Sequence, residues 1–219
     1  MLAPAPVPYL AHVGYRALDA RRYERRRYGG LRRRLKLRAL ERAVARALEG
    51  VSTDRPVLDV PCGTGILDRA LSGRGFRVIA SDISPAMLGV ARERSRRPGD
   101  TRHVLADLER PPWRRGAFAA VVCARFLMHV PAASRPRVLA TLAALTDGPL
   151  VATVCHAYTP KSATRALRRA LGMRAKDSPR LTRDALEREA AAAGLRVERV
   201  VRLVPLFSEV WVVVLRTPR

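Results

Sequence analysis

The chain has 219 residues, of which 48% are hydrophobic and 28% are charged, and its formal net charge is +23. This length and hydrophobic content suit one domain with a sizeable core and exclude a largely disordered chain. No apolar run reaches the ~20 residues of a membrane span. The three cysteines (Cys62, Cys123 and Cys155) lie too far apart for a disulfide framework or a CxxC zinc site.

The positive charge has two explanations that the sequence leaves open. A basic surface attracts polyanions such as nucleic acids. Alternatively, the 42 basic residues comprise 39 arginines and three lysines, and Asn and Gln are absent, which indicates a compositional bias. The start of the chain lacks the pattern of a secretory signal, and the dispersed cysteines fit a reducing compartment, so we expect a cytoplasmic protein.

The N-terminal segment carries an excess of positive charge. Between residues 16 and 46, thirteen basic residues stand against three acidic ones. Within LRRRLKLRALERAVARALEG (31–50), apolar residues recur at spacings of three and four, which predicts an amphipathic helix that ends at Gly50. We therefore expect a basic helical segment or lid over residues 1–50 and a ligand-binding domain over residues 51–219.

From residue 56, strands alternate with helices. The predicted strands are 56–60, 76–82, 103–107, 118–124 and 148–156, and the predicted helices are 65–73, 84–97 and 133–145. Ser84 is the expected N-cap of the second of these helices, with Pro85 at its first position. This alternation indicates right-handed crossovers and a parallel sheet covered by helices on both faces.

The C-terminal part departs from this alternation. A predicted helix at 181–194, with Thr182 as N-cap, precedes two strands at 195–205 and 208–216. The short link between these strands requires an antiparallel hairpin. The sequence thus predicts an α/β fold with a doubly wound, mostly parallel, seven-stranded sheet and an antiparallel C-terminal hairpin.

The first strand opens onto a glycine-rich loop, VLDVPCGTG (57–65). Ligands of open parallel sheets bind beyond the carboxyl ends of the strands, so this loop is the expected site. A P-loop needs a lysine that is absent here, and Asp68 stands where a dinucleotide-binding loop has its third glycine. A phosphate or dinucleotide ligand is therefore disfavoured, and with it a dehydrogenase.

Acidic residues at the strand ends fit a different ligand. Asp82 ends the second strand, where a carboxylate can accept from both hydroxyls of a ribose. Asp107 ends the third strand, placed to meet an adenine amino group while Leu108 packs on the ring. Asp59 ends the first strand and can receive an ammonium group. Ribose, adenine and ammonium sites without a phosphate site describe S-adenosylmethionine (SAM).

At these motifs the chain resembles the class I SAM-dependent methyltransferases, specifically the ubiquinone-biosynthesis type that acts on small molecules. The resemblance rests on VLDVPCGTG, ASDISPAML, ADLERPPW, AFAAVVCARFLMHV and PLVATV, and the terminal hairpin extends it to about residue 215. The family commonly has glycine where Pro61 stands. The resemblance implies a Rossmann-like methyltransferase fold and SAM as cofactor, with S-adenosylhomocysteine (SAH) as product. We expect no metal site.

The resemblance also implies roles for individual residues at the ends of four strands. The implied cofactor contacts are Asp59, Pro61, Cys62, Gly63 and Gly65 around the methionine part, Asp82 and Ile83 at the ribose and adenine, Asp107 and Leu108 at the adenine edge, and Ala124 and Arg125 near the methyl group.

The acceptor side carries weaker signals. His129 and His156 follow the fourth and fifth strands and are candidate bases, needed only if the acceptor must lose a proton. A histidine at a strand end more often has a structural role, as a hydrogen-bonded or capping residue. His103 is expected to be structural or exposed. The candidate acceptor contacts are Tyr28, Arg125, His129 and Tyr158.

Three functions remain in competition. The favoured one is methyl transfer to a small molecule, as O- or N-methylation of a metabolite or natural-product intermediate. The alternatives are a tRNA or rRNA methyltransferase that binds nucleic acid through its basic N-terminal segment, and a non-catalytic SAM-fold binding protein. An aromatic content of 5% provides few stacking platforms for RNA, which disfavours the second function.

Overall fold

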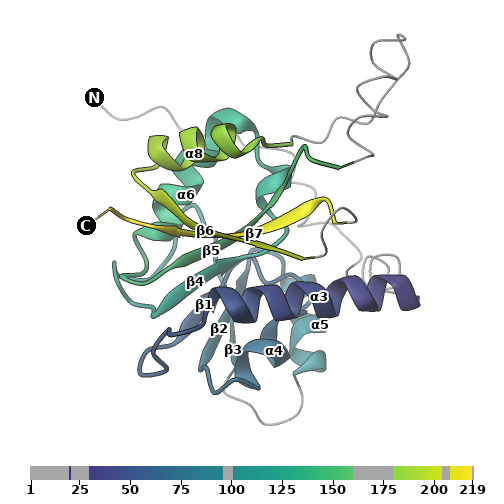
Figure 1. Ribbon diagram of the computed structural model, residues 1–219. Helices are drawn as coiled ribbons and strands as arrows, with labels where there is room; N and C mark the ends of the chain where they lie inside the picture. Colours follow the sequence, from purple (N-terminus) through teal and green to yellow (C-terminus); the bar gives the residue numbers. More distant parts are fainter. Residues whose placement is uncertain (1–19, 21–29, 96–100, 160–179, 204–207, 219) are drawn as a thin grey trace.

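A computed structural model describes residues 20, 30–95, 101–159, 180–203 and 208–218 (Figure 1). Tyr28 and most of the basic segment before residue 30 lie outside the described residues, so the expectations for them stay predictions.

One seven-stranded sheet forms the centre of the molecule, in the order β3-β2-β1-β4-β5-β7-β6. Its strands are β1 (Val57–Asp59), β2 (Val78–Asp82), β3 (Thr101–Leu105), β4 (Ala120–Cys123), β5 (Leu150–Cys155), β6 (Arg196–Arg202) and β7 (Val210–Arg216). The first five strands are parallel, whereas β7 runs antiparallel to both β5 and β6. The predicted fold class, including the C-terminal hairpin, is confirmed.

Helices cover both faces of the sheet (Figure 1). On one side lie α3 (Leu31–Ala47), α4 (Asp68–Ser72) and α5 (Pro85–Arg94), and on the other lie α6 (Arg135–Ala143) and α8 (Arg183–Ala192). Successive strand residues point to opposite faces, so Val121 packs with the α6 and α8 side while Val122 packs with the α3 side. The core therefore has two layers separated by the sheet.

Two helices begin at the predicted caps. The Ser84 hydroxyl accepts from the backbone N–H of Met87 at 3.3 Å, and the Thr182 hydroxyl accepts from that of Ala185 at 3.2 Å. These bonds satisfy backbone donors that have no partner within the helix.

Some predicted boundaries are wrong because local turns replace regular structure. The helix α3 ends at Ala47, not at Gly50, since residues 48–50 form a turn. Residues 63–67 form turns, so α4 begins at Asp68, not at residue 65. The strand β3 ends at Leu105, not at Asp107. The Asp107 carboxylate accepts from the Glu109 N–H at 2.9 Å, and its carbonyl accepts from the Arg110 N–H at 3.1 Å, which turns the chain away from the sheet.

In the part of the chain that the structure describes, no helix is long and apolar enough to cross a bilayer.

Candidate functional site

The strand order reverses between β1 and β4, because β2 and β3 extend to one side of β1 while β4 and β5 extend to the other. Ligands of such sheets bind at this switch point, outside the carboxyl ends of the strands. The predicted site residues within the described ranges all lie at or just beyond the carboxyl ends of β1, β2, β3, β4 and β5.

The loop after β1 is held close to the sheet. The Val60–Pro61 peptide bond is cis, and the Cys62 N–H donates to the Ser81 carbonyl of β2 at 2.8 Å. Gly63 and Gly65 have φ angles of 56° and 68°, in the left-handed region that favours glycine. A Cβ at Gly65 would lie 2.6 Å from a carboxylate oxygen of Asp68, whereas one at Gly63 would meet open space. The loop thus presents uncovered backbone at Gly63 and packs tightly at Gly65.

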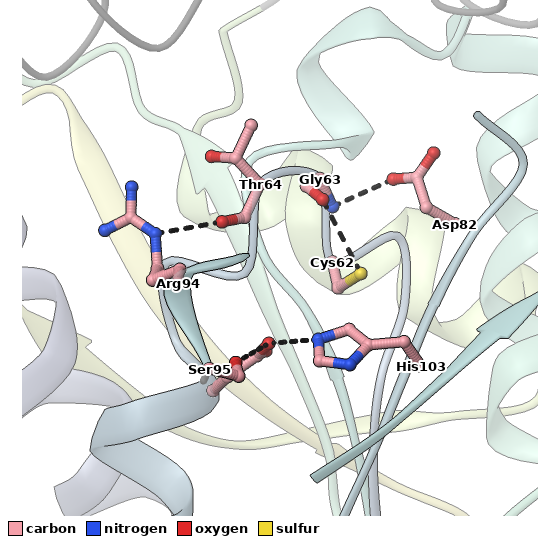
Figure 2. Close-up of polar contacts among 8 residues, drawn as sticks. Cys62, Gly63, Thr64, Asp82, Arg94, Ser95 and His103 are labelled. Atoms are coloured by element: carbon pink, nitrogen blue, oxygen red, sulfur yellow. Dashed lines mark hydrogen bonds and ion pairs between the residues drawn. The ribbon is translucent and has the colours of Figure 1, made fainter. Parts of the chain in front are cut away.

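Asp82 joins the end of β2 to this loop (Figure 2). Its two carboxylate oxygens accept from the backbone N–H groups of Gly63 at 2.8 Å and Ser84 at 2.9 Å, and the residue is 5% exposed. Burial raises the pKa of Asp82, and the backbone hydrogen bonds oppose that rise. A carboxylate offers about four lone-pair sites, so the side chain keeps capacity for ligand hydroxyls.

Asp59, at the end of β1, is a buried carboxylate. It is 1% exposed, and neither oxygen has a hydrogen-bond partner among the described residues. Burial, and then the negative charges of Asp68 and Asp82, raise the pKa of Asp59 well above its usual range. Since a buried unpaired acid is costly, this group is suited to a cationic ligand.

A second polar cluster supports the loop from below (Figure 2). The side chain of His103, on β3, contacts Asp68 Oδ2 through Nε2 at 2.9 Å, and the Ser95 hydroxyl donates to the same oxygen at 3.3 Å. Arg94 Nε donates to the Thr64 carbonyl at 3.0 Å. The side chains of His103 and Asp68 are 6% and 1% exposed, so His103 has the structural role expected of it.

Sequence reasoning missed this cluster. Asp68 entered the argument only as a group incompatible with a pyrophosphate, and nothing in the spacing links it to a histidine 35 residues further on. The alignment of β3 beside β2 provides that link.

At the adenine side of the predicted site, Ile83 is half-buried and Leu108 is 8% exposed. The Asp107 carboxylate lies in the turn beyond β3, where one of its oxygens accepts from the Glu109 N–H. It is thus two residues past the strand end, while its neighbour Leu108 packs into the core on the α6 side.

Beyond β4, Ala124 is half-buried and Arg125 adopts a left-handed conformation with φ 61°. Its N–H donates to the Thr153 hydroxyl of β5 at 2.5 Å. A non-glycine residue pays about 1–2 kcal/mol for this conformation, and such residues cluster at functional sites. Thr153 lies in the PLVATV motif, but its role in fixing Arg125 was not predicted.

The two candidate bases differ in their surroundings. His156, 6% exposed, has both ring nitrogens occupied: Nε2 lies 2.8 Å from the Ser208 carbonyl, and Nδ1 accepts from the Tyr158 N–H at 3.2 Å. Its ring also stacks on Trp211, with centroids 4.6 Å apart, and burial lowers the pKa of His156. This geometry leaves no nitrogen available to take a proton and argues against His156 as a base. His129 is exposed at the end of the turn Leu127–His129.

The thiols in this region are not activated. Burial raises the pKa of Cys62, with further contributions from nearby carboxylates, and burial also raises that of Cys123. Both side chains therefore stay protonated, which argues against a nucleophilic cysteine. Within the described residues, no group of three His, Cys, Asp or Glu side chains is arranged to hold a metal ion.

The donor set fits SAM. An unpaired buried carboxylate at Asp59 suits the ammonium of the methionine part, Asp82 suits ribose hydroxyls, and the uncovered backbone at Gly63 leaves room for the ligand between them.

The comparisons with known proteins agree with this geometry. The family model described as "Methyltransferase domain" matches residues 57–147. A magnesium-protoporphyrin O-methyltransferase from Rhodobacter capsulatus is 32% identical over 154 residues, which cover 67% of this chain and 66% of that protein. A ubiquinone biosynthesis O-methyltransferase from Pseudomonas paraeruginosa is 40% identical over 82 residues, 35% of this chain and 34% of that protein.

An 18S rRNA (guanine-N(7))-methyltransferase from Schizosaccharomyces pombe is 39% identical over 80 residues, 35% of this chain and 29% of that protein. Several alignments thus span about a third of the relatives' own length. Among solved structures, a magnesium protoporphyrin IX methyltransferase from Synechocystis PCC 6803 with bound SAH has a TM-score of 0.73 at 19% identity, covering 94% of this chain and 100% of that one. This likeness shows a common fold.

Proposed function

Since the chain belongs to the class I SAM-dependent methyltransferases, we propose that it transfers the methyl group of SAM to an oxygen or nitrogen of a small-molecule acceptor. The observation that carries this proposal is the unpaired carboxylate of Asp59 beside the glycine loop and Asp82. Oxygen is the favoured acceptor atom, because the protoporphyrin and ubiquinone relatives are O-methyltransferases.

In this proposal each cofactor contact has a distinct task. Asp59 pairs with the ammonium, and Asp82 accepts hydrogen bonds from the ribose hydroxyls. Asp107 contacts the amino group of the adenine, and Ile83 and Leu108 pack against the adenine ring. When bound, SAM supplies a methyl group already activated by its sulfonium. The chain's own residues then contribute orientation and exclusion of water.

The acceptor side is proposed on weaker grounds. Arg125, fixed by Thr153 in its left-handed conformation, is the proposed contact for an anionic or polar acceptor group. Tyr158 is 54% exposed just beyond β5, and its hydroxyl accepts from the Arg183 N–H at 3.1 Å, so it presents an oriented ring to an acceptor. His129 is the remaining candidate for a base.

RNA methylation is the second candidate function. It is supported by the rRNA methyltransferase relative and by the exposed arginines of α3. The short alignment with that relative and the low aromatic content keep it second.

The test uses methyl-labelled SAM, the purified protein and a lysate of its own host. We expect label in a solvent-extractable small molecule, and less of it at a limiting SAM concentration when the Asp82→Ala variant replaces the wild type. Label that is lost on nuclease treatment would establish the RNA function instead. Binding of SAH without transfer to any fraction would favour a non-catalytic SAM-binding protein.

A further inference from the structure

The N-terminal half of α3 exposes two leucines on one face. Leu31 is 73% exposed and Leu35 is 53% exposed, and the i, i+4 spacing places them one helical turn apart on the same side. Single exposed leucines are common on protein surfaces, but two adjacent ones on a charged helix form a directed apolar feature.

This exposed face is also strongly basic. The helix carries seven basic residues and one acidic residue, Glu41, and has no acid in its first turn. Arg34 follows Leu31 by three residues, and Arg38 and Arg42 follow Leu35 by three and seven, so these arginines lie beside the leucines on the helix. All three are exposed. Basic residues near a helix N-terminus oppose the helix dipole, so an anionic partner would relieve a local cost.

The other half of α3 fixes this face in place. Leu40, Val44 and Leu48 are buried in the core on the α3 side, where the helix packs on β6 and β7. Arg199 of β6 donates to the Arg46 carbonyl at 2.9 Å near the helix end. The N-terminal end of α3, in purple, extends past the sheet (Figure 1). The apolar and basic face is thus held at a defined position at the side of the molecule.

We propose that the N-terminal half of α3 docks the protein on an anionic phospholipid surface. Leu31 and Leu35 enter the boundary between headgroups and acyl chains, and the flanking arginines bind lipid phosphates. An amphipathic helix with arginines beside exposed leucines has the composition of an interfacial membrane helix. This inference concerns location and goes beyond the methyl transfer proposed above.

Two other partners fit the face less well. A second copy of the chain would bring two basic helices together, and their charges would repel. A nucleic acid would use the arginines but would leave the two leucines in water without a function. The leucines therefore distinguish a lipid surface from RNA.

The experiment is flotation of the full chain with vesicles of phosphatidylcholine alone and of phosphatidylcholine mixed equally with phosphatidylglycerol. We expect binding to the mixed vesicles only, weakened by added salt. Leu31→Asn with Leu35→Asn should weaken binding roughly tenfold or more at unchanged charge. Arg34→Gln with Arg38→Gln should weaken it about fivefold for each charge removed.

Leu105→Asn is the matched control, because Leu105 is 56% exposed but lies on the edge strand β3. It should leave vesicle binding unchanged. Circular dichroism checks that each variant is folded, which is expected since the substituted side chains are exposed.

Absence of binding to the mixed vesicles would overturn the proposal. So would binding that the leucine variant retains in full while a short RNA displaces the protein, because that outcome assigns the face to nucleic acid. Neither outcome depends on methyl transfer, so this test and that of the proposed function fail separately.

Discussion

At the residue scale, the two carboxylates beside the glycine loop are held in different ways. Asp82 accepts two backbone hydrogen bonds, which favour its ionised form against the effect of burial. Asp59 has no such donors among the described residues, and burial with nearby negative charge raises its pKa. Asp82 is therefore a prearranged acceptor for hydroxyls, whereas Asp59 becomes favourably charged only when a cation arrives.

Replacing Asp82 by Ala should weaken SAH binding by about 1–3 kcal/mol, because polar groups of the ligand and the Gly63 N–H lose their partner. Isothermal titration calorimetry measures this difference. Asp147→Ala is the control, since Asp147 forms an exposed ion pair with Arg55 and precedes the start of β5, at the amino ends of the parallel strands and opposite the candidate site. Unchanged affinity in a folded Asp82→Ala protein would rule out the ribose contact.

Asp59→Asn should weaken SAH binding and yet stabilise the unliganded protein as the pH approaches neutrality. The pKa of Asp59 is raised in the folded state above its unfolded value of about 3.9. The contribution of the protonated Asp59 to the free energy of unfolding is thus fully present below the unfolded pKa. It is lost as the pH rises through the folded pKa. Asparagine does not titrate, so the variant escapes this loss.

Urea denaturation over a series of pH values tests this expectation. The free energy of unfolding of Asp59→Asn, minus that of the wild type, should grow as the pH rises from about 4. A difference that is constant with pH would contradict a buried, unpaired Asp59.

At the element scale, hydrophobic patterning predicted every described strand of the sheet and the helices on its faces. The sequence pattern also indicates which strand of the C-terminal hairpin is central. The β7 residues from Trp211 to Leu215 are continuously apolar and buried, as in a central strand, whereas β6 mixes valines with charged residues, as in an edge strand. Side-chain contacts between different helices and strands could not be predicted from the sequence. The pair of Asp68 and His103 and the bond of Arg125 to Thr153 exist only because the sheet brings distant segments together.

The glycine loop gives a prediction at this scale. Gly65→Ala should destabilise the protein by more than the ~1–2 kcal/mol expected of a left-handed alanine, because its Cβ would also lie 2.6 Å from Asp68 and 3.0 Å from the Ala91 side chain. Gly50→Ala is the matched control: its φ is 78°, and nothing lies within 4 Å of the added atom. Chemical denaturation of both variants separates backbone strain from crowding. Equal destabilisation would contradict the tight packing at Gly65.

On the scale of the whole molecule, charge is divided between surface and site. The chain carries a net charge of +23, and α3 exposes arginines at its side, yet three carboxylates gather around the loop after β1. The net positive charge of the protein therefore repels a cationic cofactor at long range, whereas the carboxylates around the loop attract it within the site. Because salt screens exposed charges more than buried ones, the buried carboxylates control cofactor binding at physiological ionic strength.

Ligand-dependent stability tests the whole assembly of fold and site. SAH at a hundredfold excess over its Kd should add about 2.7 kcal/mol to the free energy of unfolding. For a chain of this length, that corresponds to a rise in Tm of about 5–10 °C. NAD should give no rise, because the buried Asp68 carboxylate, held against Gly65, occupies the place where a pyrophosphate would approach. Differential scanning calorimetry of the wild type and Asp82→Ala distinguishes these cases. The variant should show a smaller shift with SAH than the wild type at the same SAH concentration. A comparable shift with NAD would identify a dinucleotide site and contradict the assignment of this loop to SAM.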